Sequence, residues 1–289
     1  MLQDISKILI SRILNNILIF KFLYILRRKF LNFNSSTIIL EKFRNKLKKK
    51  TGYLRIKLND EQIREAIKYC KKKYSPKKIK EINKNKKKDF YLYTTKIDPY
   101  KNKPLMALAT NKKIISIISD YMGTIPILFY VGVWYTRPIN DSNSQGSQLF
   151  HFDREDFLQI KLFIPIEPIK NNSGPMNVIS ANDTSYFVKK KFLQLNIVNK
   201  KDRFPDEQIN STFKQQVVKK LTAKIGELIF VDTTNCLHFG SRNCDKGKYH
   251  ITLQYLTPYS RKLGSFLRFN KNINSPLNYL DWIKNKQNQ

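Results

Sequence analysis

The second half of the chain is divided into short runs of β-branched and aromatic residues, and this pattern constrains the fold most. Residues typical of turns, namely Gly, Pro, Asn, Asp and Ser, separate the runs. The runs read ILFYVGVWYT, FLQIKLFIPI, MNVIS, GELIFVDTT and YHITLQYLTP. Several strands at such close spacing predict an antiparallel sandwich or barrel that begins near Ile125.

The part before this β-rich region is predicted to be mainly helical, from about residue 2 to residue 122. Asp60 is a helix-capping residue, and apolar residues follow it at helical spacing as far as Lys73. A second helix is predicted over Asn111–Tyr121, where Gly123 provides a stop. The predicted class is therefore α+β with a mainly β core. A helical segment over residues 1–104 is expected to be packed on, or appended to, a core over residues 105–289.

The net charge of +32 invites a nucleic-acid or anionic-membrane interpretation. However, most of the basic residues are Lys, and Lys is abundant together with Ile and Asn, as an AT-rich genome would produce without selection for a binding surface. Phosphate recognition tends to favour the planar Arg fork. We therefore expect mostly solvated lysine and no specific nucleic-acid partner. The alternative is a catalytically inactive β-barrel whose basic surface binds nucleic acid or anionic membrane, with an affinity that falls steeply as salt rises.

The cysteines and the N-terminus bear on where the protein works. The three cysteines form no CxxC pair and show no disulfide-like spacing, which favours a reducing, cytoplasmic setting. Polar residues interrupt the apolar N-terminus, so no run approaches the length of a bilayer span, and no small-residue cleavage site follows it. We expect a packed or amphipathic helix here. Peripheral membrane contact through residues 1–30, with the basic cluster Arg27, Arg28 and Lys29, is the alternative.

The stretch LFHFDREDF carries candidate metal ligands. His151 and Asp153 are two residues apart on a predicted strand and so point to the same face. His238, another of the three histidines, follows a later strand in GELIFVDTTNCLHFG. Two imidazoles and one carboxylate leave coordination positions open, a set that suits non-haem Fe(II). Zinc is the competing metal, although the helical HExxH motif of many zinc hydrolases is absent. A structural role for each residue is the remaining alternative.

The order of these motifs carries a family resemblance. HFD, KLFIPIEPIKNNSGPMNVIS, GELIFVDTTNCLHFG and KYHITLQYLTP follow one another in the chain. Together they resemble the phytanoyl-CoA dioxygenase-like family of Fe(II)/2-oxoglutarate-dependent oxygenases, over about residues 105–260. Gly174 with Pro175, and the segment Asp232–Gly240, match well. Ile179–Asn182 departs from the family's Gly-Ser-His-like element.

The resemblance implies a fold, a reaction and a ligand set. The fold would be a double-stranded β-helix, the jelly roll of cupin-like proteins, with an N-terminal helical layer. The protein would be a dioxygenase that uses Fe(II) and 2-oxoglutarate and hydroxylates a small-molecule substrate with release of succinate and CO2. The implied iron ligands are His151, Asp153 and His238.

The family's usual 2-oxoglutarate anchor, an Arg a short distance past the distal histidine, is missing here. A bidentate pair between arginine and the co-substrate's carboxylate explains that usual choice. The residues that could replace it are Lys161, Lys248, His250 and Arg242. Two of them have a structural alternative: Lys161 is equally compatible with a solvent-exposed strand edge, and a strand residue that faces a polar neighbour is the favoured interpretation of His250.

Candidate substrate-pocket residues lie on the strand before HFD. They are Tyr130, Trp134, Tyr135 and Arg137. Aromatic residues on strands more often belong to the core, and Arg137 is equally compatible with a strand end in solvent.

Overall fold

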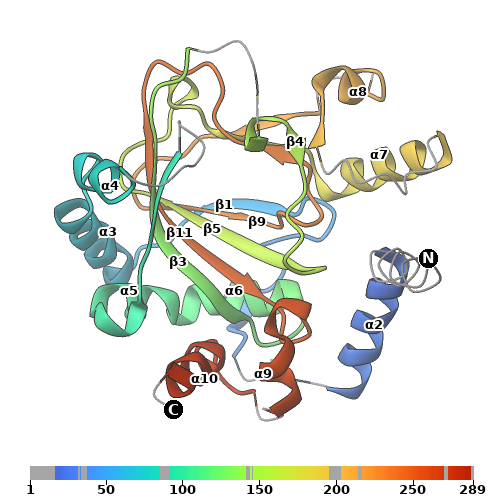
Figure 1. The fold of residues 1–289 in the computed structure, drawn as a ribbon, viewed down its shortest axis with the longest axis horizontal. Helices are drawn as coiled ribbons and strands as arrows, with labels where there is room; N and C mark the ends of the chain where they lie inside the picture. The colour runs from blue at the N-terminus through green and yellow to red at the C-terminus, as the bar shows by residue number, and fades with distance from the viewer. Residues whose placement is uncertain are drawn as a thin grey trace, which may run out of the picture.

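Two antiparallel β-sheets form the centre of the protein (Figure 1). The computed structural model describes residues 17–31, 33, 38–84, 92–140, 144, 146–194, 203–213, 217–269 and 273–287. Within these residues the larger sheet has six strands, in the order β1 (Tyr53–Lys57), β9 (Glu227–Val231), β5 (Gln159–Pro165), β11 (Lys248–Leu256), β3 (Ile127–Thr136) and β2 (Leu92–Lys96). The smaller sheet has the described strands β7 (Arg203–Phe204), β4 (Phe150–His151), β10 (His238–Phe239), β6 (Met176–Val178) and β8 (Lys219–Leu221). The predicted mainly β core with helices is confirmed.

The long strand β11 shows how the larger sheet is used on both faces. Every residue of this strand is buried. One set of alternate side chains joins the main hydrophobic core, namely Tyr249, Ile251, Leu253 and Tyr255. The other set points to the opposite face, toward the smaller sheet, and consists of the more polar His250, Thr252 and Gln254. The inner face of the larger sheet is therefore partly polar, which is unusual for a purely structural core.

Helices cover the outer face of the larger sheet (Figure 1). They are α3 (Glu61–Lys73), α4 (Pro76–Ile82), α5 (Lys103–Ala109) and α6 (Lys112–Met122). Their apolar residues share one core with the outward side chains of β3, β5, β9 and β11. Each aliphatic side chain buried there stabilises the fold by roughly 1.5–3 kcal/mol relative to exposure. The two helices predicted from sequence are confirmed as α3 and α6, and Gly123 closes α6 with a φ of 66°.

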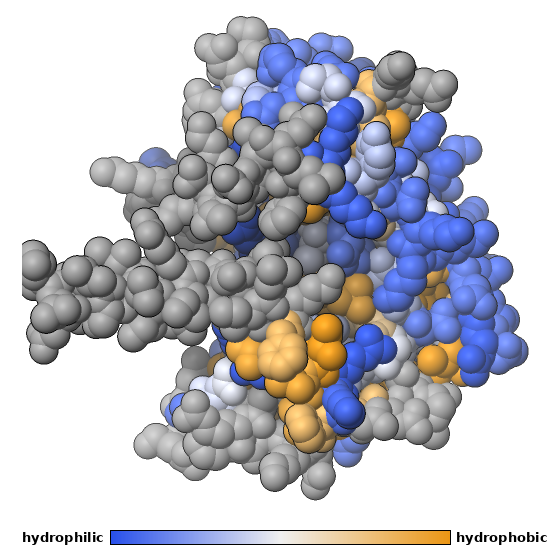
Figure 2. Space-filling model, turned by 90° about the vertical axis from the view of Figure 1, so that its right-hand side faces the viewer, coloured by the Kyte–Doolittle hydropathy of each residue, from blue (hydrophilic) through white to orange (hydrophobic). Residues whose placement is uncertain are grey.

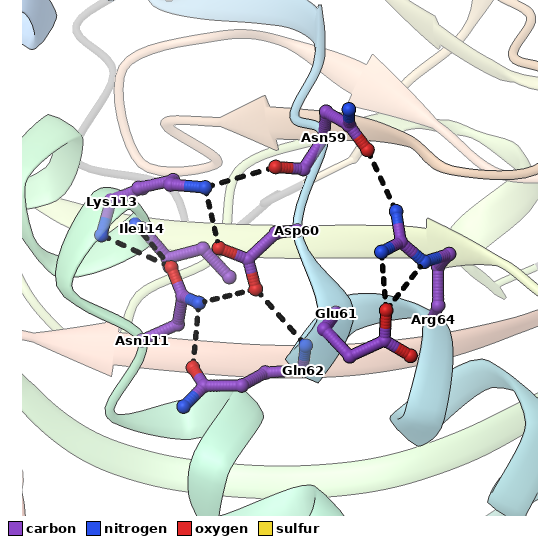
Figure 3. Close-up of polar contacts among 8 residues, drawn as sticks. All are labelled: Asn59, Asp60, Glu61, Gln62, Arg64, Asn111, Lys113 and Ile114. Atoms are coloured by element: carbon purple, nitrogen blue, oxygen red, sulfur yellow. Dashed lines mark hydrogen bonds and ion pairs between the residues drawn. The ribbon is translucent and has the colours of Figure 1, made fainter.

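The beginnings of α3 and α6 are fastened to each other by their caps (Figure 3). The Asp60 carboxylate accepts a hydrogen bond from the backbone N–H of Gln62 at the start of α3. It also accepts one from the Asn111 amide at 3.0 Å and pairs with Lys113 at 2.7 Å. Asn111 in turn accepts hydrogen bonds from the first backbone N–H groups of α6. These contacts satisfy N–H groups that have no partner inside a helix.

The N-terminal part is less helical than predicted, because it contributes two strands to the larger sheet. β1 pairs with β9, from Tyr53 opposite Val231 to Lys57 opposite Glu227. β2 pairs with β3 in the same way on the other edge. Residues on both sides of the expected boundary at 104–105 thus belong to one sheet. Short strands in lysine-rich surroundings carry little local signal, and their partners lie far away in the sequence.

The remaining helices pack around the ends of the two sheets. They are α2 (Ile17–Phe30), α7 (Ala181–Gln194), α8 (Asp206–Asn210), α9 (Gly264–Phe269) and α10 (Asn278–Gln287). Short 3-10 turns occur at Glu41–Phe43, Pro99–Lys101, Gly146–Gln148, Asn171–Ser173 and Arg261–Leu263. Phe187 of α7 and Ile209 of α8 pack on the outer side of the smaller sheet, while α2, α9 and α10 share a cluster with Ile127 and Leu256. Among the described residues, no helix has the length and apolar character needed to cross a bilayer.

Candidate metal centre

His151 and His238 lie directly opposite each other in the smaller sheet. β4 and β10 are antiparallel, and their register pairs these two residues. The neighbours Phe150 and Phe239 point outward into the cluster beside α7, so the two imidazoles point inward, between the sheets. Their ring centroids are 4.4 Å apart.

Asp153 joins the two histidines from the loop that follows β4. Its backbone N–H donates to the carbonyl of Thr233 at 3.0 Å, which holds this loop against the turn that leads to His238. The Asp153 Oδ2 atom lies 3.7 Å from His238 Nε2. One ligand atom from each of His151, Asp153 and His238 lies within 4.8 Å of the others. The geometry therefore brings together the three residues that the sequence singled out.

Both histidines have their tautomers set by the backbone. The Nδ1 atom of His151 lies 2.8 Å from the carbonyl oxygen of Leu149, and that of His238 lies 2.9 Å from the carbonyl oxygen of Cys236. A carbonyl oxygen can only accept, so each Nδ1 must carry the proton and donate. Each Nε2 then keeps a free lone pair. A hydrogen bond from the other ring nitrogen to a backbone carbonyl is common for metal-binding histidines, because it orients the ring.

The charges of the cluster also suit a cation. Burial lowers the pKa of His238 to about 4, despite the opposing effect of the Asp153 carboxylate, and burial likewise lowers the pKa of His151. Burial alone would raise the pKa of Asp153, but the Lys161 ammonium and the two histidines together outweigh it, and the net shift of the pKa is downward. Near neutral pH the cluster therefore consists of two neutral imidazoles and one carboxylate, the protonation states that bind metals.

Lys161 reaches into the same space from β5. Its Nζ atom lies 2.7 Å from Asp153 Oδ2, and its side chain is only 14% exposed. The ammonium also lies 5.9 Å from the centre of the Trp134 ring. Lys161 is thus an inward-facing cation next to a candidate ligand, and the alternative of a solvent-exposed strand edge is wrong.

His250 and Thr252 add polar groups deeper on the inner face of the larger sheet. Within the described structure, His250 Nδ1 and Thr252 Oγ1 are buried and have no hydrogen-bond partner. The His250 ring lies against Trp134 and Phe163, at centroid distances of 5.9 and 5.5 Å. Sequence reasoning missed Thr252 and Phe163. The period of two along a strand could have found Thr252, since it shares a face with His250.

Lys248 and Arg242 have partners elsewhere. Burial lowers the pKa of Lys248 to about 8, and its Nζ atom donates to the Gly174 carbonyl at 2.9 Å. Arg242 forms two hydrogen bonds with the Asp206 carboxylate, at 2.9 and 2.7 Å, and its guanidinium lies 3.7 Å from the centre of the Phe239 ring. Because Phe239 points away from the space between the sheets, the structure does not bring Arg242 to the histidine cluster.

The expected pocket residues separate onto two faces of β3. Trp134 is opposite His250, and its Nε1 atom donates to the Tyr130 hydroxyl at 2.8 Å on the inner face. Tyr135 is opposite Tyr249 and stacks on Tyr93, on the outer face beneath the helices. The expectation that Tyr135 lines the same pocket as Trp134 is therefore wrong, because consecutive strand residues point in opposite directions. Arg137 follows the end of β3 and is half-buried.

Comparison with known proteins finds similar folds among solved structures only. The chain matches no protein-family model and no curated protein sequence. Among solved structures, it resembles the non-heme alpha ketoglutarate dependent carbocyclase SnoK from nogalamycin biosynthesis, with 12% identity and a TM-score of 0.51 over 82% of this chain and 94% of that chain. It also resembles HygX from Streptomyces hygroscopicus with nickel and 2-oxoglutarate bound, with 9% identity and a TM-score of 0.50 over 82% and 97% of the two chains.

A third similar structure is EctD from S. alaskensis, with 10% identity and a TM-score of 0.50 over 79% of this chain and 81% of that chain. At these identities the likeness concerns the fold. The chain thus shares its fold with these solved structures, and it carries a cluster of two histidines and one carboxylate.

Proposed function

We propose that this protein is an Fe(II)- and 2-oxoglutarate-dependent oxygenase with a double-stranded β-helix core, and that it hydroxylates a small molecule in the cytoplasm. The observation that carries the proposal is the convergence of His151, Asp153 and His238 within 4.8 Å between the two sheets. The similar folds and the family resemblance of the sequence motifs support it.

The donor set fits iron. Two imidazole Nε2 atoms and one carboxylate would occupy one side of an octahedral ion and leave the other positions open. Bound there, Fe(II) together with 2-oxoglutarate and dioxygen would supply the oxidising chemistry, with succinate and CO2 as co-products. The backbone carbonyls of Leu149 and Cys236 hold the imidazoles in the binding tautomer. Asp153 provides the negative charge.

Lys161 is the residue that we propose binds a carboxylate of 2-oxoglutarate. Its ammonium already pairs with a carboxylate in this space, at 2.7 Å from Asp153. A metal ion on Asp153 would take over that neutralisation, and Lys161 would then be available to a second carboxylate. Lys248 is a weaker candidate, because its ammonium already meets the Gly174 carbonyl. Arg242 is weaker because its guanidinium lies against Phe239 and pairs with Asp206, away from the histidine cluster.

His250 and Thr252 would contribute neutral hydrogen bonds to the same co-substrate. A buried polar atom without a partner costs about 1–3 kcal/mol, so two such atoms on adjacent inward positions of β11 favour a polar ligand in this space. Trp134 and Phe163 would form the apolar walls around it. Tyr130 and Trp134 would then face the substrate side, as partly buried aromatic groups on the inner face of β3.

The direct test is the formation of the iron and 2-oxoglutarate complex, followed by turnover. Anaerobic addition of Fe(II) and 2-oxoglutarate should produce a visible charge-transfer band, and exposure to oxygen should release succinate. Asp153→Ala should abolish both signals. Asp245→Ala, which removes an exposed carboxylate away from the cluster, is the matched control and should retain both. Full iron affinity in Asp153→Ala would show that the ligand assignment is wrong.

A further inference from the structure

Helix α2 is fixed to the protein along one side. Its Tyr24 ring lies 5.4 Å from the ring of Phe157 and 5.8 Å from that of Tyr259. Arg27 Nη1 donates to the Tyr259 carbonyl at 3.3 Å. Leu31, just after the helix, packs into the same cluster as Phe33. These contacts set the rotation of α2 about its own axis.

The opposite side of α2 presents large apolar side chains to solvent. Phe22 is 59% exposed, Ile25 54% and Phe30 78%, and Leu23 is also exposed at 41%. At about 100° per residue, Phe22, Ile25 and Phe30 fall on one arc of the helix, on the side away from Tyr24, and Leu23 lies at the edge of this arc. Figure 2 faces the side of the molecule that carries α2 and shows apolar side chains gathered beside hydrophilic ones in its lower part. A contiguous exposed apolar face on a helix marks a surface that contacts another apolar phase.

The charges that border this face indicate what it contacts. Arg28 and Lys29 are exposed in the last turn of α2, and Lys29 lies within the same arc as Phe22 and Ile25. A symmetric contact between two copies of the chain would bring these cations together, on a protein that already carries a net charge of +32. An anionic lipid surface complements both features at once, since its headgroups meet the cations and its acyl region meets the apolar side chains.

We propose that α2 docks the protein onto the surface of an anionic bilayer. Because Tyr24, Arg27 and Leu31 hold one side of α2 against the protein, the helix would meet the bilayer with its opposite side and lie along the interface. The Tyr24 contact with Phe157 then places the segment that follows Asp153 on the membrane side of the protein. The proposal extends the sequence-based alternative of peripheral contact through residues 1–30. Of residues 1–30, α2 is the part that the structure describes. Membrane contact through α2 does not depend on the proposed oxygenase activity.

Co-sedimentation of the full chain with lipid vesicles tests this proposal. The protein should pellet with vesicles of phosphatidylcholine and phosphatidylserine, more weakly with phosphatidylcholine alone, and less as salt is raised. The triple variant Phe22→Ser/Ile25→Ser/Phe30→Ser should bind anionic vesicles at least tenfold more weakly, and Lys29→Gln by a smaller factor. The matched control is Tyr186→Ser/Val188→Ser on α7, which removes exposed apolar groups elsewhere and should bind like the wild type.

Two outcomes would overturn the proposal. The first is equal vesicle binding by the wild type and the triple variant when circular dichroism shows that both are folded. The second is a wild-type dimer that becomes monomeric in the triple variant, with no vesicle binding by either; this result would assign the apolar face to a second copy of the chain. If the triple variant fails to fold, Phe22→Ser and Phe30→Ser alone provide the test, because these two side chains are the most exposed of the four.

Discussion

His238 lies directly across the β4–β10 ladder from His151, with the two ring centroids 4.4 Å apart. This pairing turns two distant positions of the sequence into one side of a candidate metal site. Both rings are oriented by the same device, a backbone carbonyl two residues earlier in the chain that accepts from Nδ1. The symmetry of the arrangement leads to a simple expectation about metal binding.

We expect His151→Ala and His238→Ala each to weaken Fe(II) binding at least tenfold, because each removes one of three donors. The third histidine provides the control. His250 lies among Trp134 and Phe163 rather than in the cluster, so His250→Ala should keep the metal affinity. Anaerobic calorimetry measures the three affinities. An equal loss in His250→Ala would contradict the ligand assignment.

Lys161→Met should raise the KM for 2-oxoglutarate by at least tenfold while iron still binds. The variant removes the ammonium next to Asp153 but none of the three metal donors. Lys161→Arg should restore part of the affinity, since it keeps the positive charge. Lys248→Met serves as the comparison, because its partner is the Gly174 carbonyl. A larger effect on KM in Lys248→Met than in Lys161→Met would transfer the anchoring role to Lys248.

The stability of the protein should fall as pH rises from about 4 to about 7 because of Asp156. Burial raises the pKa of this carboxyl to about 7, although hydrogen bonds from Thr257 and from backbone N–H groups oppose the shift. The unfolded chain loses the same proton near pH 4. Within this window the folded state alone keeps the proton, so the free energy of unfolding decreases with increasing pH.

Asp156→Asn should remove this pH dependence, because the amide oxygen can still accept from Thr257 and carries no charge. Relative to the wild type, the variant should gain stability as pH rises from about 4 to about 7, by on the order of 3–4 kcal/mol. Urea unfolding at several pH values measures the difference. The exposed Asp245 gives the control variant Asp245→Asn. If the free energy of unfolding changes with pH in the same way for the wild type and Asp156→Asn, then Asp156 is not the cause of the pH dependence.

Gly174→Ala should destabilise the protein by about 2–4 kcal/mol. Gly174 has a φ of +63°, where an L-residue costs about 1–2 kcal/mol, and a Cβ atom there would lie 2.6 Å from the Cβ of Ser241. Gly226 has a φ of +82° with no atom near the position of a Cβ. Gly226→Ala should therefore show the conformational cost alone, about 1–2 kcal/mol. Chemical denaturation measures the free energy of unfolding of both variants. An equal loss of stability in the two would mean that the contact with Ser241 is easily relieved.

Local features of the fold were predictable where the sequence carries a local signal. The Asp60 cap, the Gly123 stop and the β-branched and aromatic runs of β3, β5, β9 and β11 depend on neighbouring residues, and these elements were expected. β1 and β2 were not, because their strand character depends on pairing with β9 and β3. Alternation along β3 already separates Trp134 from Tyr135, but which of the two faces inward depends on which face of the sheet the helices cover.

The sequence by itself determined the types of element in most of the chain, since spacing along a strand or helix follows from short-range backbone geometry. It also singled out the three candidate metal ligands, His151 and Asp153 by their spacing and His238 by the scarcity of histidines and the family resemblance. Only the tertiary structure decided that His238 meets His151, that Lys161 points to Asp153, and that Arg242 is held by Asp206 on the outer side of the smaller sheet. These relationships depend on the register between distant strands. That register is set by which face of each strand is buried, because a shift of one residue would turn every side chain to the opposite face.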